Sequence, residues 1–380
     1  MKPDARPLTV LLHGDPRAAQ QARLGAALAA RGHRVIVCDA PLIAERIRET
    51  APCEELRLPP PQLPEALRRW WTRRRVRELG VDVVHLNFVR PWHVIWSRMR
   101  GGPPYVATAW GSDLTDHVFR KTPANRRRID HVLAHASAVT ADSGPLLELA
   151  RSRGAGADVP ARRVLWSADV GVFDRDRAAS SRARWIEELE LAGARRVLLS
   201  PRQTKPHYHV DRILRAFAAS RFAEGGVLLI KLYGRPEEDP HRVELERVAA
   251  DLGVGDRVRF VRPCAYDELP GLYATADAAV SALEHDGVPS TFSELLALGV
   301  PLVATDLGSY RDVLVDGERA LLVAPGDHDA LVSALDRLAT DPDLVARLVA
   351  GGRAWAKSVD WNGCVDAFEE IYRAACAPTT

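Results

Sequence analysis

Short runs of aliphatic and β-branched residues alternate with longer helical patterns along almost the whole chain, and this alternation constrains the fold most. The first repeat is clear: residues 8–12 form a strand-like run, residues 18–31 an Ala-rich helical pattern, Gly32 a C-terminal stop and residues 34–38 the next strand-like run. A buried strand followed by a helix is the repeating unit of α/β proteins. The sequence therefore predicts parallel sheets with helices on both faces.

The strand-like runs fall into two sets, separated by a polar and then helical segment at residues 174–193. The first set covers residues 8–12, 34–38, 81–86, 105–109 and 138–141, and the second covers 196–200, 226–233, 257–261, 278–282, 301–305 and 320–323. A chain of 380 residues is long enough for two cores. We predict one Rossmann-like domain at residues 1–175 and a second at 176–355. A last helix at 356–380 packs on one or the other.

Composition and charge exclude several other classes of protein. Lys and Arg total 52 and Asp and Glu total 50, so the net charge of +2 is far from the excess typical of nucleic-acid-binding proteins. The five cysteines include no Cys-x-x-Cys pair, which fits neither a disulfide framework nor a zinc site. No apolar run reaches the roughly 18 residues of a membrane span, and residues 1–7 lack the apolar core of a signal peptide. We expect a cytoplasmic protein.

The segment at residues 281–301 combines three features of a nucleotide site. A strand ends in acidic residues that include Asp286, a turn of small residues follows, and a helix starts at about Ser290. The N–H groups and the dipole at such a helix start suit an anionic phosphate. Glu294 lies in the first turns of that helix, where an acidic residue accepts hydrogen bonds from ribose hydroxyls in other doubly wound sheets. This combination indicates a nucleotide or nucleotide-sugar.

This segment resembles that of the retaining glycosyltransferases of family four, and the resemblance extends over nearly the whole chain. Those enzymes carry a Glu, seven intervening residues and a second Glu, and here Asp286 and Glu294 have the same spacing. The resemblance implies the α/β fold called GT-B, in which two Rossmann-like domains with parallel sheets face each other across a cleft. It also implies that Asp286 and the amides of Gly287 and Val288 face the donor sugar, those of Ser290 and Thr291 the diphosphate, and Glu294 the ribose.

Further positions follow strands in the way the family's donor-binding residues do. Arg202 and Lys205 follow the first strand of the second domain and match an Arg and Lys pair of the family. Two fixed cations there would neutralise charge on the departing diphosphate. By the same resemblance, Gly14, Gly234 with the preceding Tyr233, and Arg262 approach the phosphates or the base.

The resemblance implies that the N-terminal domain faces the acceptor. Trp110 stands in Trp-Gly-Ser-Asp, where many relatives carry His-Gly-x-Asp with a His that often contacts the donor sugar. An indole offers only an N–H donor, so Trp110 cannot transfer a proton. His85, Asp113 and His117 are the candidates to replace that His, and Asp113 is the predicted catalytic one.

We predict neither a bound metal ion nor a cofactor. Asp174-Arg-Asp176 resembles the Asp-x-Asp motif with which another, single-domain glycosyltransferase fold holds a divalent ion on the diphosphate. It lies at the predicted domain break, however, and Asp341-Pro-Asp343 has the same spacing at an ordinary helix start.

The most basic stretch of the chain runs from Arg68 to Arg77, after a segment with four prolines at residues 58–64. It includes two Trp and six Arg. Its residues indicate either a solvated helix whose Trp and Val76 face the core, or a peripheral contact with an anionic membrane or a phosphorylated acceptor. Both interpretations stay open at the level of sequence.

Together the motifs predict a glycosyltransferase that moves a sugar from a nucleotide-sugar, with a UDP-sugar as the expected donor, to an unidentified small-molecule, saccharide or lipid-linked acceptor. The resemblance implies retention of configuration. An epimerase, a hydrolase or a non-catalytic donor-binding protein on the same scaffold is the alternative, because Trp110 replaces the usual His. A nicotinamide dehydrogenase does not fit, because no Gly-x-Gly-x-x-Gly follows the first strand.

Overall fold

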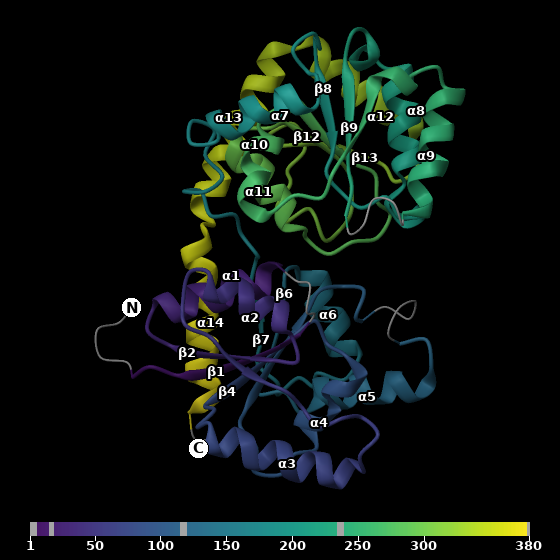
Figure 1. Ribbon diagram of the computed structural model, residues 1–380. Coiled ribbons are helices and arrows are strands. Elements are labelled where there is room, and N and C mark those ends of the chain that lie inside the picture. The colour runs from purple at the N-terminus through teal and green to yellow at the C-terminus, as the bar shows by residue number, and fades with distance from the viewer. Residues whose placement is uncertain (1–5, 15–18, 115–119, 234–238, 378–380) are drawn as a thin grey trace. The chain divides into compact units, whose positions relative to one another are not determined.

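The computed structural model describes residues 6–14, 19–114, 120–233 and 239–377. The chain divides into two compact units (Figure 1). Unit 1 comprises Met1–Trp166 and Asn362–Thr380, and unit 2 comprises Ser167–Trp361. The two Rossmann-like α/β domains expected from the sequence are therefore present, each with its own parallel sheet.

Unit 1 is built on a seven-stranded parallel sheet in the order β3-β2-β1-β4-β5-β6-β7. Its strands are β1 (Thr9–Gly14), β2 (Arg34–Cys38), β3 (Glu54–Leu56), β4 (Val83–Asn87), β5 (Tyr105–Ala109), β6 (Ala138–Ala141) and β7 (Ala161–Arg163). Its helices are α1 (Ala19–Ala30), α2 (Pro41–Arg48), α3 (Glu65–Glu78), η1 (Pro91–His93), α4 (Val94–Ser97), α5 (Pro123–Ala134), α6 (Gly144–Ser152) and α14 (Trp361–Cys376). The strand order reverses between β1 and β4, which is the switch point where open α/β sheets bind ligands.

Unit 2 has a six-stranded parallel sheet in the order β10-β9-β8-β11-β12-β13. Its strands are β8 (Val197–Ser200), β9 (Val227–Lys231), β10 (Val258–Val261), β11 (Ala278–Ser281), β12 (Leu302–Thr305) and β13 (Leu321–Val323). Its helices are α7 (Ala179–Glu188), η2 (Pro206–Tyr208), α8 (Val210–Ala219), η3 (Arg221–Ala223), α9 (Pro240–Asp251), η5 (Gly255–Arg257), η6 (Tyr266–Glu268), α10 (Leu269–Tyr273), α11 (Ser290–Leu298), α12 (His328–Thr340) and α13 (Pro342–Ser358). The switch point lies between β8 and β11.

The central strands of both sheets are buried on both faces, which explains their continuous aliphatic sequences. In unit 1 the buried residues of α3, α4, α5 and α6 join one core cluster on one face of the sheet. In unit 2, α8, α9 and α12 pack their buried sides into a single cluster with the strands.

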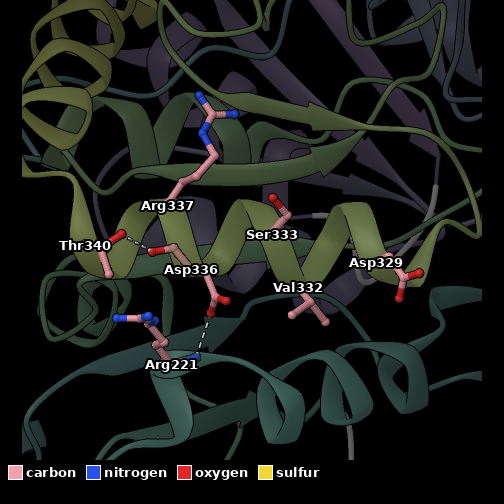
Figure 2. Close-up of a pocket in the computed structure, with 7 residues that line it drawn as sticks. All are labelled: Arg221, Asp329, Val332, Ser333, Asp336, Arg337 and Thr340. Carbon is pink, nitrogen blue, oxygen red and sulfur yellow. Dashed lines mark hydrogen bonds between the residues drawn. The ribbon is translucent and has the colours of Figure 1, made fainter.

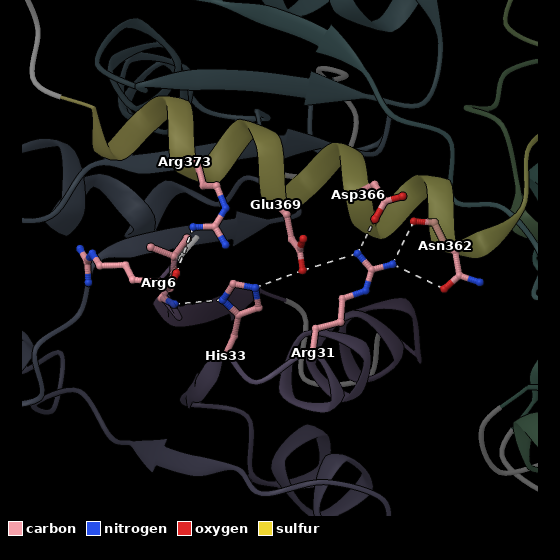
Figure 3. A network of polar contacts seen from close by, with 8 residues as sticks. Arg6, Arg31, His33, Asn362, Asp366, Glu369 and Arg373 are labelled. Atoms are coloured by element: carbon pink, nitrogen blue, oxygen red, sulfur yellow. Dashed lines mark hydrogen bonds and ion pairs between the residues drawn. The ribbon is translucent and has the colours of Figure 1, made fainter. Parts of the chain in front are cut away.

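Helix α14 lies on the other face of the unit 1 sheet, which α1 and α2 also cover, although it follows unit 2 in the sequence. Buried His33 receives the Leu8 N–H at Nδ1 and pairs with Glu369 of α14 through Nε2 at 3.0 Å (Figure 3). Arg31, at the end of α1, pairs with Asp366 of α14 at 2.5 Å (Figure 3). These contacts fix the helix on unit 1.

The boundary between the units differs from the predicted break after residue 175, because contacts divide the chain after Trp166. Phe173 packs its ring against Tyr266 and Tyr273 of unit 2, with ring centroids 5.5 and 6.4 Å apart. The segment that follows Trp166 thus belongs to the second core. At the other end, α13 continues to Ser358, so the last helix starts at Trp361 rather than at residue 356.

Among the described residues, no helix combines the length and the apolar character that crossing a bilayer requires.

Candidate active site

An ion pair joins the ends of two neighbouring strands of unit 2. Arg202 follows β8 and Asp286 follows β11, and Arg202 Nη2 lies 2.7 Å from Asp286 Oδ2. Both side chains are largely shielded from solvent. Burial raises the pKa of Asp286 above its ordinary value, while Arg202, the Tyr310 hydroxyl and the Gly287 N–H oppose that rise. The structure thus brings together two residues that the sequence assigns to the diphosphate and to the sugar.

Tyr310 is a member of this site that the sequence analysis missed. Its hydroxyl donates to Asp286 Oδ2 at 3.0 Å, and the neighbouring Ser309 hydroxyl donates to the Asp286 carbonyl oxygen at 2.8 Å. The Tyr310 ring is fully buried and meets Phe292 of α11 edge-on, with centroids 4.8 Å apart. Its position shortly after the carboxyl end of β12 is the signal that could have identified it.

The start of α11 lies directly after this cluster. Pro289 is the N-cap residue and supplies no side-chain cap, and its carbonyl oxygen accepts the Phe292 N–H at 3.0 Å. Thr291 and Glu294 are buried in this helix. Gly299, with a φ of 71°, ends it in the left-handed conformation that glycine adopts without strain. Ser290 and Thr291 therefore occupy the helix start that the sequence predicts.

Lys231, at the end of β9, is a second site residue that the sequence analysis missed. Its Nζ lies 3.5 Å from the centroid of the Tyr233 ring. Burial lowers the pKa of Lys231, and the charge of Glu294 opposes that change. The Tyr233 hydroxyl donates to the Pro201 carbonyl oxygen at 2.9 Å, which ties the end of β9 to the loop that carries Arg202. A lysine that ends an aliphatic strand is the signal that was available.

The other residues predicted to bind the donor differ in exposure and in their contacts. Lys205 is exposed and occupies the N-cap position of η2 without a side-chain cap. Arg262 is held by Glu188 at 2.8 Å and by Glu268 at 2.9 Å, with its guanidinium over the Trp185 ring, so its side chain serves the packing of α7. Any contact with a base at this position would come from the backbone. Gly234 lies outside the described residues.

His85, which we expected on the acceptor side, is fully buried in unit 1. Its Nε2 is 2.6 Å from Thr108 Oγ1, and its Nδ1 is 2.7 Å from the Tyr372 hydroxyl. Burial lowers its pKa to about 3. Because both ring nitrogens are engaged and the ring is shielded, the structure corrects the expectation: His85 joins the sheet to α14 and offers nothing to an acceptor.

Asp113 and Trp110 organise the loop after β5. The Asp113 carboxylate accepts the N–H of Val89 at 2.9 Å and that of Trp110 at 3.0 Å, and burial raises its pKa to about 6. The Trp110 indole donates to Asn87 Oδ1 at 2.6 Å. Asp113 is fully buried, so these contacts favour a positioning role over the predicted proton transfer. His117 lies outside the described residues.

Gly14 ends β1 at the switch point of the unit 1 sheet. A Cβ at this position would collide with the Asn87 carbonyl oxygen and the Gln21 side chain, so only glycine fits between β4 and α1. The close approach of β4 and α1 is enough to explain why glycine occupies position 14, with or without a bound phosphate.

One group of side chains among the described residues is spaced like metal ligands: His13, Cys38 and Asp39 of unit 1. The Trp96 indole donates to His13 Nδ1 at 2.9 Å, so in the neutral ring Nε2 carries the proton and has no lone pair for a metal. Burial raises the pKa of the Cys38 thiol well above its ordinary value. Asp174, of the Asp-x-Asp sequence, accepts the N–H groups of Asp176 and Arg177, which is a turn contact.

A depression of about 540 Å³ lies elsewhere on unit 2, between α12 and η3 (Figure 2). The Asp336 carboxylate accepts the Arg221 N–H at 2.7 Å and so joins its two walls (Figure 2). None of the residues singled out by the sequence lines it.

Two family models match the chain, one to each unit. Residues 21–164 match the model described as Glycosyltransferase Family 4, and residues 181–355 match the one described as Glycosyl transferases group 1. Together they account for most of the chain.

Curated relatives are similar to this chain at low identity. A D-inositol 3-phosphate glycosyltransferase of Thermomonospora curvata is 31% identical over 184 residues, which cover 47% of this chain and only 43% of the relative. A GDP-mannose-dependent alpha-(1-6)-phosphatidylinositol monomannoside mannosyltransferase of Mycolicibacterium smegmatis is 29% identical over 306 residues, covering 77% and 76%.

Solved structures share the fold. HepE of Anabaena, in complex with UDP-glucose, superposes with a TM-score of 0.80 at 18% identity and covers 97% of this chain and 100% of its own. A glycosyltransferase of Rickettsia africae superposes with a TM-score of 0.81 at 15% identity, covering 99% and 100%. With the two family models and the two parallel-sheet units, these likenesses identify the chain as a group 1 glycosyltransferase of family four, with the GT-B fold.

Proposed function

We propose that this enzyme transfers a glycosyl group from a nucleotide-sugar to a hydroxyl acceptor, with retention of configuration and without a metal ion. The observation that carries the proposal is the Arg202–Asp286 ion pair in front of the α11 helix start. The α11 start and a second carboxylate follow on the same segment after β11: Asp286 is largely shielded, and Glu294 of α11 is buried. A nucleotide-sugar presents matching groups: a diphosphate for the cation and amides, and hydroxyls for the carboxylates.

In this proposal the donor replaces one partner of Arg202 with another. The guanidinium turns from Asp286 to the diphosphate, with which it forms stronger charge-assisted hydrogen bonds. The Asp286 carboxylate then accepts hydrogen bonds from the sugar, while the Tyr310 hydroxyl keeps its hydrogen bond to Oδ2, the oxygen that Arg202 leaves. Asp has one methylene less than the Glu usual in the family, and the hydrogen bond from Tyr310 fixes where this shorter side chain points.

Arg202, Lys205 and the amides of Ser290 and Thr291 stabilise the charge that develops on the diphosphate as the bond to the sugar breaks. Their fixed positive charge takes the part that a divalent ion has in other transferases. An oxygen of the departing phosphate takes the proton of the acceptor hydroxyl, so the reaction requires no histidine at position 110. This assignment agrees with the structural roles of His85 and Asp113.

We propose a UDP-sugar as donor and a cyclitol or saccharide, free or linked to a lipid, as acceptor. The names of the curated relatives support this acceptor class, because one acts on an inositol phosphate and another on a phosphatidylinositol mannoside. The second relative uses GDP-mannose, so GDP-sugars belong in any donor screen beside UDP- and dTDP-sugars.

A thermal-shift screen of donors, followed by an assay of nucleotide release, tests the proposal. A donor at 100 times its dissociation constant stabilises the folded state by about 2.7 kcal/mol, which is readily measured. Arg202→Ala should lose this stabilisation and cut transfer about a hundredfold or more, as the loss of a preorganised charge at a leaving group does. Arg247→Ala, which removes an exposed arginine of α9, is the matched control and should behave like the unmodified enzyme.

The same assay separates transfer from the alternative chemistries. Release that depends on the acceptor means transfer, whereas release or isomerisation without an acceptor means hydrolysis or epimerisation. NMR of the product reports the anomeric configuration. Activity should survive a chelator; its loss, with rescue by a divalent ion, would refute the metal-free mechanism. A fully active Arg202→Ala variant would refute the assignment of the leaving-group site.

A further inference from the structure

The outer face of α3 carries a row of exposed apolar side chains that continues into arginines. Leu63, just before the helix, is 40% exposed, Leu67 is 47% exposed and Trp70 is 57% exposed. Arg74 and Arg77 are exposed one and two turns further on. Residues spaced by three and four positions lie on one side of a helix, so Leu67, Trp70, Arg74 and Arg77 form one row. We call this row, together with Leu63 just before the helix, the α3 stripe.

The fold of unit 1 does not use the α3 stripe. Helix α3 packs through Thr72 and Val76, which are buried, and Trp71 is partly buried against the same core cluster. The expectation that Trp and Val76 face the core is therefore met by Trp71 but not by Trp70.

Positive charge surrounds the apolar part of the α3 stripe. Helix α3 contains six arginines and two glutamates. One glutamate, Glu65, is shared among several arginines: a hydrogen bond from Arg98, helped by the charges of Arg69 and Arg128, lowers its pKa. The other, Glu78, pairs with both Arg74 and Arg75. The carboxylates therefore neutralise only part of the positive charge.

The apolar half of the α3 stripe lies at the ligand-binding edge of unit 1. Helix α3 connects β3 to β4, which run in parallel, so its first turns lie at the carboxyl edge of the sheet. The other exposed large apolar side chains among the described residues of unit 1, Leu42 and Trp92, follow β2 and β4 at that same edge. The exposed large apolar side chains of unit 1 thus belong to segments that follow strands at the carboxyl edge of the sheet.

We propose that the α3 stripe binds the surface of an anionic lipid bilayer. Leu63, Leu67 and Trp70 would enter the boundary between headgroups and acyl chains, where tryptophan is favoured. The arginines would pair with lipid phosphates, and their surplus positive charge matches a negative surface. A bilayer fits better than a folded partner, because the exposed row is narrow and bordered by long cationic side chains that reach a planar surface. The proposal does not depend on the identity of the donor.

Vesicle flotation with the full chain tests this proposal. The protein should float with vesicles of phosphatidylcholine mixed with phosphatidylglycerol. A much smaller fraction of the protein should float with vesicles of phosphatidylcholine alone. Binding should weaken as salt is added, because salt screens the attraction. Replacing Arg77 by Gln should lower the partition coefficient about fivefold, the effect of one basic residue near such a surface.

The double variant Leu67→Gln, Trp70→Gln should lower the partition coefficient about tenfold or more, because both side chains lose their apolar burial. Val243→Gln is the matched control, since Val243 is an isolated exposed side chain on α9 that is 68% exposed. Unchanged thermal unfolding of each variant shows that the fold is intact.

The proposal is overturned if the protein does not float with anionic vesicles, or if the double variant floats as well as the unmodified chain. It is also overturned if the unmodified chain forms a dimer that the double variant does not, because a second copy would then cover the α3 stripe.

Discussion

The candidate site residues of unit 2 and those predicted in unit 1 have different kinds of hydrogen-bond and ion-pair partners. Arg202 and Asp286 are paired with each other, and in the proposed function a diphosphate replaces Asp286 as the partner of the arginine. His85 and Asp113, in contrast, are fully buried and bind neighbours that belong to the fold. A fixed buried group stabilises a loop or a helix contact, whereas an exchangeable ion pair can respond to a substrate.

Replacing Tyr310 by Phe tests whether the hydrogen bond to Asp286 positions that carboxylate. The variant keeps the ring against Phe292 and removes only the donor, so the fold should lose about 1 kcal/mol. Without the hydroxyl, Asp286 should be less well placed toward the sugar. We expect kcat to fall about tenfold with a smaller change in the affinity for free nucleoside diphosphate, measured by steady-state kinetics and calorimetry.

Tyr208→Phe is the control for that measurement, because Tyr208 lies against Arg202 and makes no hydrogen bond to Asp286 among the described residues. Equal losses of kcat in both variants would show that Tyr310 has no special positioning role.

At the scale of secondary structure, α14 packs on unit 1, although the whole of unit 2 separates it from the rest of unit 1 in the sequence. Phe368 is fully buried and packs its ring against His85 and Trp166, at centroid distances of 5.0 and 5.1 Å. Tyr372 and Glu369, on the same side of the helix, bind His85 and His33. The side of α14 that faces the sheet therefore combines aromatic packing with hydrogen bonds to two buried histidines.

Truncation of Phe368 to Ala should destabilise unit 1 by about 3–5 kcal/mol, the usual cost of emptying a fully buried aromatic site. Glu370→Ala, on the exposed side of the same helix, removes only a surface ion pair with Arg162 and should cost less than about 1 kcal/mol. Chemical denaturation, followed by signals from both units, measures the free energy of unfolding of the two variants. A similar small effect of both substitutions would mean that α14 contributes little to unit 1.

At the scale of the whole molecule, the sequence predicts those features in which a residue's role depends on its neighbours along the chain. The alternation of strand and helix patterns predicted both sheets, and Arg202, Asp286 and the α11 start lie together because parallel strands end at one edge. The edge strands β3 and β7 were missed, since Glu-Glu-Leu and Ala-Arg-Arg have no aliphatic run.

Other features depend on contacts between distant segments, which a local pattern does not encode. Tyr310 meets Asp286 only because β11 and β12 are neighbours, and the unit boundary is set by where Phe173 packs. His85 shows the opposite error: its position near the end of the predicted strand suggested function, but it lies in the middle of β4 and α14 covers it.

The buried histidines of unit 1 make the stability of the molecule depend on pH. Burial lowers the pKa of His13 to about 4 and that of His85 to about 3, while in the unfolded chain both titrate near pH 6.5. Between these values the unfolded state binds more protons, so stability falls as the pH drops from about 6.5 to about 4. Asp113, with its pKa raised to about 6, acts in the opposite direction and offsets part of the slope.

We expect the melting temperature to decrease over this pH range. A His85→Gln variant should have a shallower slope, by close to one proton, whatever its stability at pH 7. An unchanged slope in that variant would show that His85 does not remain neutral in the folded state.

The return of the chain to unit 1 at Asn362 also sets the order in which the protein can be completed on the ribosome. The sheet of unit 1 is translated first, but the helix that covers His33 and His85 emerges only after all of unit 2. Until then the part of the sheet that α14 covers stays exposed, while unit 2 already has every strand it needs. The second unit to be translated is therefore the first that can reach its final core.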